Sequence, residues 1–142
     1  IFVLNKADQI RSEKESIEEI ITNTRQYLTN IGVESQNIIP ISAYAAKIFK
    51  LALADKLKTY DDEIDFEFYY NWFSKNRILP VKQSILENDI SVKIFGKEYK
   101  RSDILEKICA TGIIELEKEL ERLMKDKISK HIKKEIKYYG KK

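Results

Sequence analysis

The sequence has few of the residues on which several common kinds of site depend. Its 142 residues include one cysteine, one histidine, two prolines and four glycines. A single cysteine excludes a disulfide scaffold and a cysteine-based zinc site, and a single histidine excludes a histidine-rich metal site. The apolar runs are short, and no basic start precedes a long apolar stretch. We therefore expect no membrane-spanning helix, no signal peptide and a cytoplasmic setting.

The composition is that of a folded chain, and its charge is unevenly distributed. Hydrophobic residues make up 43% of the chain and aromatic residues 11%, which argues against disorder. The formal net charge is +3, yet residues 125–142 alone hold eight lysines against two acidic residues. Because this segment carries +6, the remainder carries about −3. The basic character therefore belongs to the C-terminal segment.

The beginning of the chain follows a strand–helix–strand pattern. Residues 1–4 are a continuous apolar run, typical of a strand buried on both faces of a parallel sheet. A helix is predicted over 12–31, with Ser12 as N-cap and Glu15 completing a capping box, and a second strand over 37–42. This order is typical of one unit of a parallel sheet. Because the chain starts inside an apolar run, we expect a fragment whose upstream part is missing.

The middle of the chain is predicted to be mainly helical. The pattern favours a helix over 43–57, an acidic break at 61–63, and a helix over 64–74, for which a strand is the alternative. The aromatic residues of this last segment are expected to form core rather than a membrane-inserting or partner-binding surface. Residues 76–90 are ambiguous, with Pro80 as a helix start and Asn88-Asp89 as a break.

The last part of the chain combines a predicted hairpin with two helices. Alternation in 91–100 predicts a small β-hairpin that turns at Gly96-Lys97. Ser102-Asp103 is typical of a cap for a short helix through Ala110, and Thr111-Gly112 interrupts the helical pattern. The longest helical pattern covers 113–138 and has an apolar stripe, formed by Leu116, Leu120, Leu123, Met124, Ile128, Ile132 and Ile136. The predicted fold is thus an α/β fragment, a strand–helix–strand unit of a parallel sheet, followed by a mainly helical region with a small hairpin and a long C-terminal helix.

A short polar motif, Asn5-Lys6-Ala7-Asp8, directly follows the first predicted strand. It has the N-K-x-D pattern of guanine-nucleotide-binding proteins. Guanine presents N1–H and N2–H₂ as adjacent donors, and the Asp8 carboxylate can accept both, whereas adenine lacks this pair. Asn5 can reach guanine N7 and tie neighbouring loops together, and the stem of Lys6 can cover the base with its ammonium near the ribose. On the motif alone, a strand end with an Asn turn and an Asp helix cap is the alternative.

Together with the residues after the second strand, this motif resembles a known family. Leu4-Asn5-Lys6-Ala7-Asp8 and Pro40-Ile41-Ser42-Ala43 resemble the base-recognition loops in the C-terminal third of a P-loop GTPase domain. The resemblance implies that the Ala43 N–H donates to guanine O6, where a small residue lets the base approach the backbone. Ser42 can also be read as the N-cap of the next helix, and both roles are compatible. Tyr44 stands where the family commonly has lysine.

The distal part of the chain narrows the resemblance to one group. The segment 111–117, Thr-Gly-Ile-Ile-Glu-Leu-Glu, resembles the one that opens the last helix of the GTPase domain in bacterial dynamin-like proteins. The long insertion before it is also similar to that group. We accordingly divide the chain into the C-terminal part of a GTPase domain over 1–58, a helical insertion over 59–110 and a long basic helix over 111–142.

The sequence lacks the phosphate-binding half of such a site. The four glycines cannot supply the G-x-x-x-x-G-K-[ST] of a P-loop, and none follows an aspartate at D-x-x-G spacing. Phosphate contacts supply most of the grip on a nucleotide. We therefore expect this chain alone to bind GTP or GDP weakly or not at all and to hydrolyse none. The resemblance implies that the parent protein is a GTPase, with Mg²⁺ held by residues outside this chain.

The basic C-terminal helix leaves several partners open. It suits anionic lipid headgroups at a membrane surface, and the resemblance implies self-association. A solvated helix face that continues into a helical neck is the favoured interpretation. Nucleic acid is disfavoured because aromatic residues are sparse in this segment. A different class of function is the alternative to the GTPase: a non-enzymatic helical interaction module with a basic C-terminal helix.

Overall fold

The computed structural model describes residues 1–9, 16–33, 37–81 and 90–139. Near the N-terminus, strand β1 (Phe2–Leu4) pairs in parallel with β2 (Ile38–Pro40), so that Leu4 lies opposite Pro40. Helix α1 (Ile17–Asn30) connects the two strands and packs against β2. A single 3₁₀ turn, η1 (Ala7–Gln9), follows β1. The predicted strand–helix–strand unit is confirmed.

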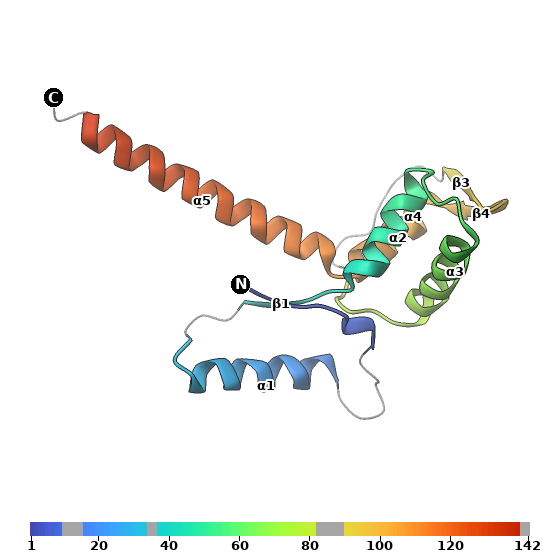
Figure 1. The fold of residues 1–142 in the computed structure, drawn as a ribbon, viewed down its shortest axis with the longest axis horizontal. Coiled ribbons are helices and arrows are strands. Elements are labelled where there is room, and N and C mark those ends of the chain that lie inside the picture. Colours follow the sequence, from blue (N-terminus) through green and yellow to red (C-terminus); the bar gives the residue numbers. More distant parts are fainter. Residues whose placement is uncertain (10–15, 34–36, 82–89, 140–142) are drawn as a thin grey trace.

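The rest of the chain is mainly helical, as predicted. Helices α2 (Ala43–Leu53), α3 (Tyr60–Lys75) and α4 (Arg101–Ala110) gather at one end of the molecule, beside the antiparallel hairpin of β3 (Ser91–Ile94) and β4 (Lys97–Lys100). Helix α5 (Ile113–Tyr139) starts at this helical group and extends away from it (Figure 1). None of the helices that the structure describes combines the length and the apolar composition needed to cross a bilayer.

The core lies between α2, α3 and α4. The fully buried ring of Phe49 on α2 meets Phe66 and Phe73 of α3 edge to face, with centroids 6.1 and 5.8 Å apart. Such pairs add to the energy of burial. The prediction that the aromatic residues of 64–74 form core is confirmed for Phe66, Tyr69 and Phe73, whereas Phe68 is exposed.

Strand β1 is not buried on both faces, and that prediction is wrong. The side chains of Phe2 and Val3 are exposed, whereas all three residues of β2 are buried. The sheet has two strands, so β1 has a neighbour on one edge only. Helix α1 packs on β2 instead.

The first helix is capped by a later serine than the sequence suggested. Ser16 accepts the N–H of Glu19, and the Glu19 carboxylate accepts the N–H of Ser16, which forms a complete capping box. The predicted cap, Ser12 with Glu15, lies outside the described residues, and α1 begins at Ile17. Both serines precede a glutamate by three residues, so local sequence did not distinguish them.

The acidic residues 61–63 are not a break but the first turn of α3. Thr59 accepts the N–H of Asp62, whose carboxylate in return accepts the N–H of Thr59. Acidic side chains are favourable at this end of a helix because its free N–H groups carry partial positive charge. The helix, rather than the alternative strand, is confirmed for 64–74.

The predicted hairpin is confirmed, and its turn is centred one residue earlier, at Phe95-Gly96. Both residues have positive φ, 48° and 77°, as a two-residue type I′ turn requires. The predicted cap at Ser102-Asp103 is wrong, because both residues lie inside the first turn of α4 and Lys100 is the N-cap. The Asp103 carboxylate bonds to Tyr70 and Lys107 instead.

The remaining boundaries differ in detail. Helix α2 ends at Leu53, and Leu57, predicted to lie in it, is buried in the following loop. Pro80 does not begin a helix within the described residues, and Asn88-Asp89 lies outside them. The interruption at Thr111-Gly112 and the long helix after it are confirmed.

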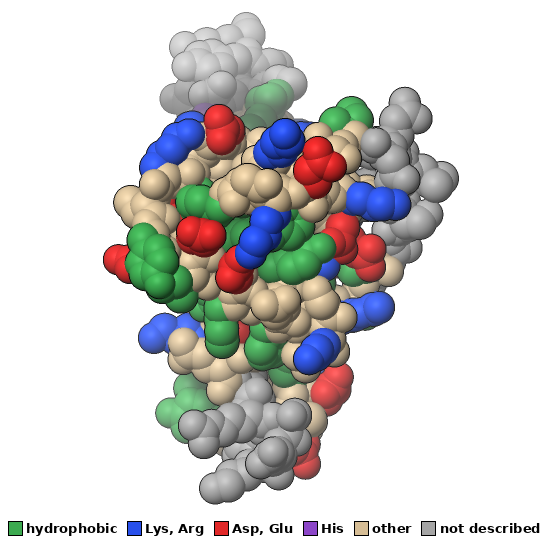
Figure 2. All heavy atoms as spheres, turned by 90° about the vertical axis from the view of Figure 1, so that its right-hand side faces the viewer, with side chains coloured by type: hydrophobic (Ala, Val, Ile, Leu, Met, Phe, Trp, Pro, Cys, Tyr) green, Lys and Arg blue, Asp and Glu red, His purple; other side chains and the backbone are tan. Residues whose placement is uncertain are grey.

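Charges are mixed on the end of the molecule that carries β3, β4 and α3. Figure 2 shows acidic and basic side chains interspersed around apolar ones on this face, without a patch of one sign among the described residues in view. A nucleic-acid backbone is bound by clustered positive charge. This face therefore offers no such surface.

Candidate functional site

The two loops that carry the predicted site residues meet at the carboxyl ends of β1 and β2. The Ile41 N–H donates to the Leu4 carbonyl at 2.8 Å, and the Ala7 N–H donates to the Ile41 carbonyl at 3.0 Å. These bonds continue the parallel pairing beyond the strands and hold η1, with its buried Ala7, against the second loop. The loops of Asn5 and Ser42 therefore lie side by side, where ligands of parallel sheets bind.

Asn5 joins the two loops through its side chain. Its Oδ1 accepts the N–H of Ala43 at 3.2 Å and the N–H of Lys6 at 2.8 Å. Asn5 therefore ties the loops together, one of the two roles predicted for it. The contact also engages the Ala43 N–H, which the resemblance assigns to guanine O6. A base would take this donor by sharing it with Asn5, and the 3.2 Å distance is long for an N–H···O bond.

Lys6 has an unusual backbone conformation. Its φ is 61°, in the left-handed region that residues other than glycine rarely adopt, at a cost of about 1 kcal/mol or more. The Asn5 side chain accepts its N–H in this conformation. Lys6 and Asn5 are exposed, whereas Asp8, inside η1, is half-buried. The two charged residues of the motif are thus accessible from solvent.

Two tyrosines border the loops, and the sequence did not predict this. The rings of Tyr44 and Tyr69 pack edge to face with centroids 5.9 Å apart. The Tyr44 hydroxyl donates to Asp65 at 2.5 Å, and this bond raises the pKa of Tyr44 to about 12. Burial, followed by the nearby charges of Asp8 and Asp65, raises the pKa of Tyr69. Both hydroxyls therefore keep their protons at neutral pH.

Only one of these tyrosines left a signal in the sequence. Tyr44 could be noticed because it stands where the GTPase family commonly has the lysine of a Ser-Ala-Lys motif. Nothing in the sequence indicates that the charge of Asp8 acts on Tyr69, because this effect depends on how α3 packs.

Ser42 is held by its backbone and not by its hydroxyl. Its N–H donates to the Thr111 carbonyl at 2.9 Å, which attaches the second loop to the turn between α4 and α5. Ser42 is the N-cap of α2, yet its side chain makes no capping bond. The residue is 1% exposed, and its Oγ has no hydrogen-bond partner among the described residues. An unsatisfied buried hydroxyl opposes stability.

Comparisons with protein families, curated proteins and solved structures found no match. The resemblance to GTPases therefore rests on the two loop motifs and their spacing.

Replacing Ser42 with alanine is expected to stabilise the protein by about 1 kcal/mol. The substitution removes an unsatisfied buried hydroxyl without removing a capping bond. Urea unfolding of the variant and the wild type would measure the difference. Ser16→Ala is the matched control and is expected to cost about 1 kcal/mol, because the Ser16 hydroxyl does cap its helix. A comparable loss for Ser42→Ala would show that the Ser42 hydroxyl is bonded in solution.

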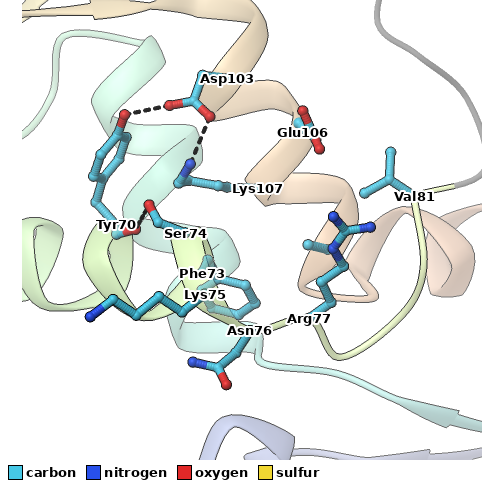
Figure 3. Close-up of a pocket in the computed structure, with 11 residues that line it drawn as sticks. Tyr70, Phe73, Ser74, Lys75, Asn76, Arg77, Val81, Asp103, Glu106 and Lys107 are labelled. Atoms are coloured by element: carbon cyan, nitrogen blue, oxygen red, sulfur yellow. Dashed lines mark hydrogen bonds and ion pairs between the residues drawn. The ribbon is translucent and has the colours of Figure 1, made fainter.

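A polar cavity lies apart from these loops, between α3 and α4 (Figure 3). Its volume is about 300 Å³. The Lys107 ammonium lies 2.7 Å from the Asp103 carboxylate and 4.3 Å from the centroid of the Tyr70 ring, and the Tyr70 hydroxyl donates to Asp103. Burial raises the pKa of Asp103, but hydrogen bonds from Lys107 and Tyr70 outweigh this effect and hold the pKa below its usual range. These charges satisfy one another, so we assign the cluster a structural role.

A second cavity of about 560 Å³ lies between β2 and the start of α5. Neither cavity is lined by the predicted site residues. The described residues also hold no cluster of three or more His, Cys, Asp or Glu side chains that could bind a metal ion.

Proposed function

We propose that this chain is the guanine-base-recognition part of a GTP-binding protein, a GTPase similar to the bacterial dynamin-like group. The observation that carries the proposal is the bond from the Ala43 N–H to Asn5 Oδ1. It joins the two predicted base loops at the carboxyl ends of two parallel strands. The two residues are 38 positions apart, and the contact matches the loop-bracing role predicted for Asn5.

Each residue of the two loops has a role in this proposal. Asp8 accepts the N1–H and N2–H₂ donors of guanine, which selects guanine over adenine. Lys6 covers the face of the base with its stem, and Asn5 reaches N7 while it braces the loops. The Ala43 N–H donates to O6, at a position fixed by the Ser42 backbone. Phosphate binding, Mg²⁺ binding and hydrolysis belong to residues outside this chain.

The proposal predicts weak but base-selective binding by the chain itself. Guanosine monophosphate at millimolar concentration is expected to shift the backbone amide NMR signals of Lys6, Asp8 and Ala43, and adenosine monophosphate is not. Asp8→Asn is expected to weaken guanine binding about tenfold or more, because a charge-assisted pair is lost, and to favour xanthine. Equal shifts with the two nucleotides, or none, would contradict the proposal.

The matched control for this experiment is Asp126→Asn on α5. It removes the same charge from α5, which extends away from the helical group (Figure 1). The control is expected to leave the guanine-dependent shifts unchanged. A similar loss in both variants would attribute the effect to net charge and not to base recognition.

The second candidate function is the helical interaction module. It is favoured by a specific observation: α5 carries exposed apolar side chains at four-residue spacing, including Leu120 and Ile128. Such a module would show no preference between guanine and adenine in the titration above. The apolar row of α5 is compatible with a GTPase as well, so the row alone does not distinguish the two candidate functions.

A further inference from the structure

Helix α5 exposes a regular row of apolar side chains. Leu120 is 47% exposed, Met124 63%, Ile128 56% and Ile132 49%. The row begins at the half-buried Leu116 and has one member every four residues. Beyond its first turns, α5 extends away from the other described elements (Figure 1). An exposed apolar surface of this kind is typical of an interaction site.

The shape of the row favours a helix as its partner and disfavours a flat membrane. In a helix of 3.6 residues per turn, each step of four residues advances the row by about 40°, so the row winds across the helix surface. A row at this spacing forms a ridge that packs into the groove of another helix. Binding in a bilayer surface instead needs a broad apolar face along one side. The row is one residue wide over most of its length.

The charges beside the row change sign at its middle. The two flanking rows are Glu117, Glu121, Lys125, Ser129, Lys133 on one side and Glu115, Glu119, Leu123, Lys127, His131 on the other. Every ionised residue in them is acidic before Met124 and basic after it. The apolar row is itself symmetric about Met124, since Leu120 and Ile128 are equally distant from it.

We propose that the α5 row binds the α5 row of a second copy of this chain in antiparallel orientation, with Met124 at the two-fold axis. Leu120 then packs against the partner subunit's Ile128. In this arrangement each flanking row of one subunit lies beside the same row of the partner subunit, which runs in the opposite direction. Acidic residues therefore meet basic ones, whereas a parallel pair would place like charges together. This inference does not depend on nucleotide binding.

One charge pair is best suited to test the arrangement. Glu117 already pairs with Lys50 of α2, and Glu119 pairs with Arg122 at 2.6 Å, so changing them would disturb contacts within the chain. Glu121 and Lys125 are both exposed and lie in the same flanking row. In the antiparallel pair, Glu121 faces the partner subunit's Lys125.

Sedimentation velocity of the full chain at increasing concentration tests the association. The contact is small, so we expect a weak dimer at roughly tens to hundreds of micromolar. Met124→Glu is expected to weaken dimerisation at least tenfold, because it places two carboxylates at the two-fold axis. Circular dichroism should show unchanged helix content, since Met124 is exposed. A monomer at all concentrations, or a dimer indifferent to Met124→Glu, would overturn the proposal.

Charge exchange tests the pairing of the flanking rows. Glu121→Lys and Lys125→Glu are each expected to weaken the dimer about fivefold at low salt, and the double variant to recover most of the loss. Lys130→Glu is the matched control, because residue 130 lies on the face of α5 opposite the row. An equal effect of Lys130→Glu, or no recovery in the double variant, would count against the antiparallel pairing.

A distance measurement tests the orientation. A spin label at Lys134→Cys in a Cys109→Ala background should give a separation of about 35 Å in the antiparallel dimer, because the labels lie about 30 Å apart along the axis and on the two outer faces. A parallel dimer would bring the labels to about 20 Å, the spacing of packed helices plus the width added by the two outer faces. The short distance, or a monomer that binds phosphatidylserine vesicles through this row, would replace the proposal.

Discussion

Replacing Gly112 with alanine is expected to lower the free energy of unfolding by about 3 kcal/mol or more and to displace the Ser42-Ala43 loop. A Cβ at this position would lie 2.2 Å from the Pro40 carbonyl oxygen, which is backbone and cannot move aside cheaply. The φ of Gly112 is +80°, a conformation that alanine adopts only with strain. Steric overlap and backbone strain therefore act together.

Gly32→Ala is the matched control for this experiment. Gly32 has nearly the same φ, +81°, but no atom of the described residues lies within 4 Å of its Cβ position. We expect it to cost about 1 kcal/mol from backbone strain alone. Urea unfolding gives both values, and the amide NMR signals of Ser42 and Ala43 report the loop. Equal losses in the two variants would show that the contact with Pro40 does not matter.

Replacing Asp103 with alanine is expected to cost about 3 kcal/mol, because it leaves the Lys107 ammonium buried without its carboxylate. The Lys107 side chain is 8% exposed, and removing one partner of a buried pair is strongly destabilising. The Asp103 side chain is 34% exposed, which places the effect at the lower end of the usual range. Thermal or urea unfolding measures the loss.

The double variant Asp103→Ala with Lys107→Met is the control. It removes both charges and is expected to recover most of the stability. The stabilisation by Asp103 should also depend on pH. Because its folded pKa is lowered, the contribution is present above the usual aspartate range, near pH 4, and is lost as pH falls through the lower folded value. A double variant no more stable than Asp103→Ala would contradict this account.

Local sequence patterns predicted most of the secondary structure and the neighbourhood of the candidate site. Gly96 marked a hairpin because the turn needs positive φ, and the apolar period of 113–138 marked a long helix. The approach of Asn5 to Ser42 could be expected because parallel strands end at the same edge of a sheet. These features depend on residues close in sequence or on topology alone.

The features that the sequence did not reveal depend on tertiary packing. The exposure of Phe2 depends on which elements cover the sheet, and the burial of Lys107 on how α3 meets α4. The approach of Gly112 to Pro40 joins two segments that no local pattern connects. The same limit applies to Tyr69, whose pKa is raised by burial and by the charge of Asp8 because of how α3 packs.

Strand β1 and helix α1 form an N-terminal unit that makes few buried contacts, which favours local opening. Within α1, Leu28 is the one buried residue, and β1 has a single neighbouring strand and an exposed face. Segments with few buried contacts open more readily than the rest of a protein. Asn5 and Asp8 belong to this less stable unit, whereas Ser42 is attached to the helical core through Thr111. We therefore expect the loop of Asn5 and Asp8 to open at a lower free energy than the loop of Ser42, and a ligand that contacts both loops to slow amide exchange in β1 most.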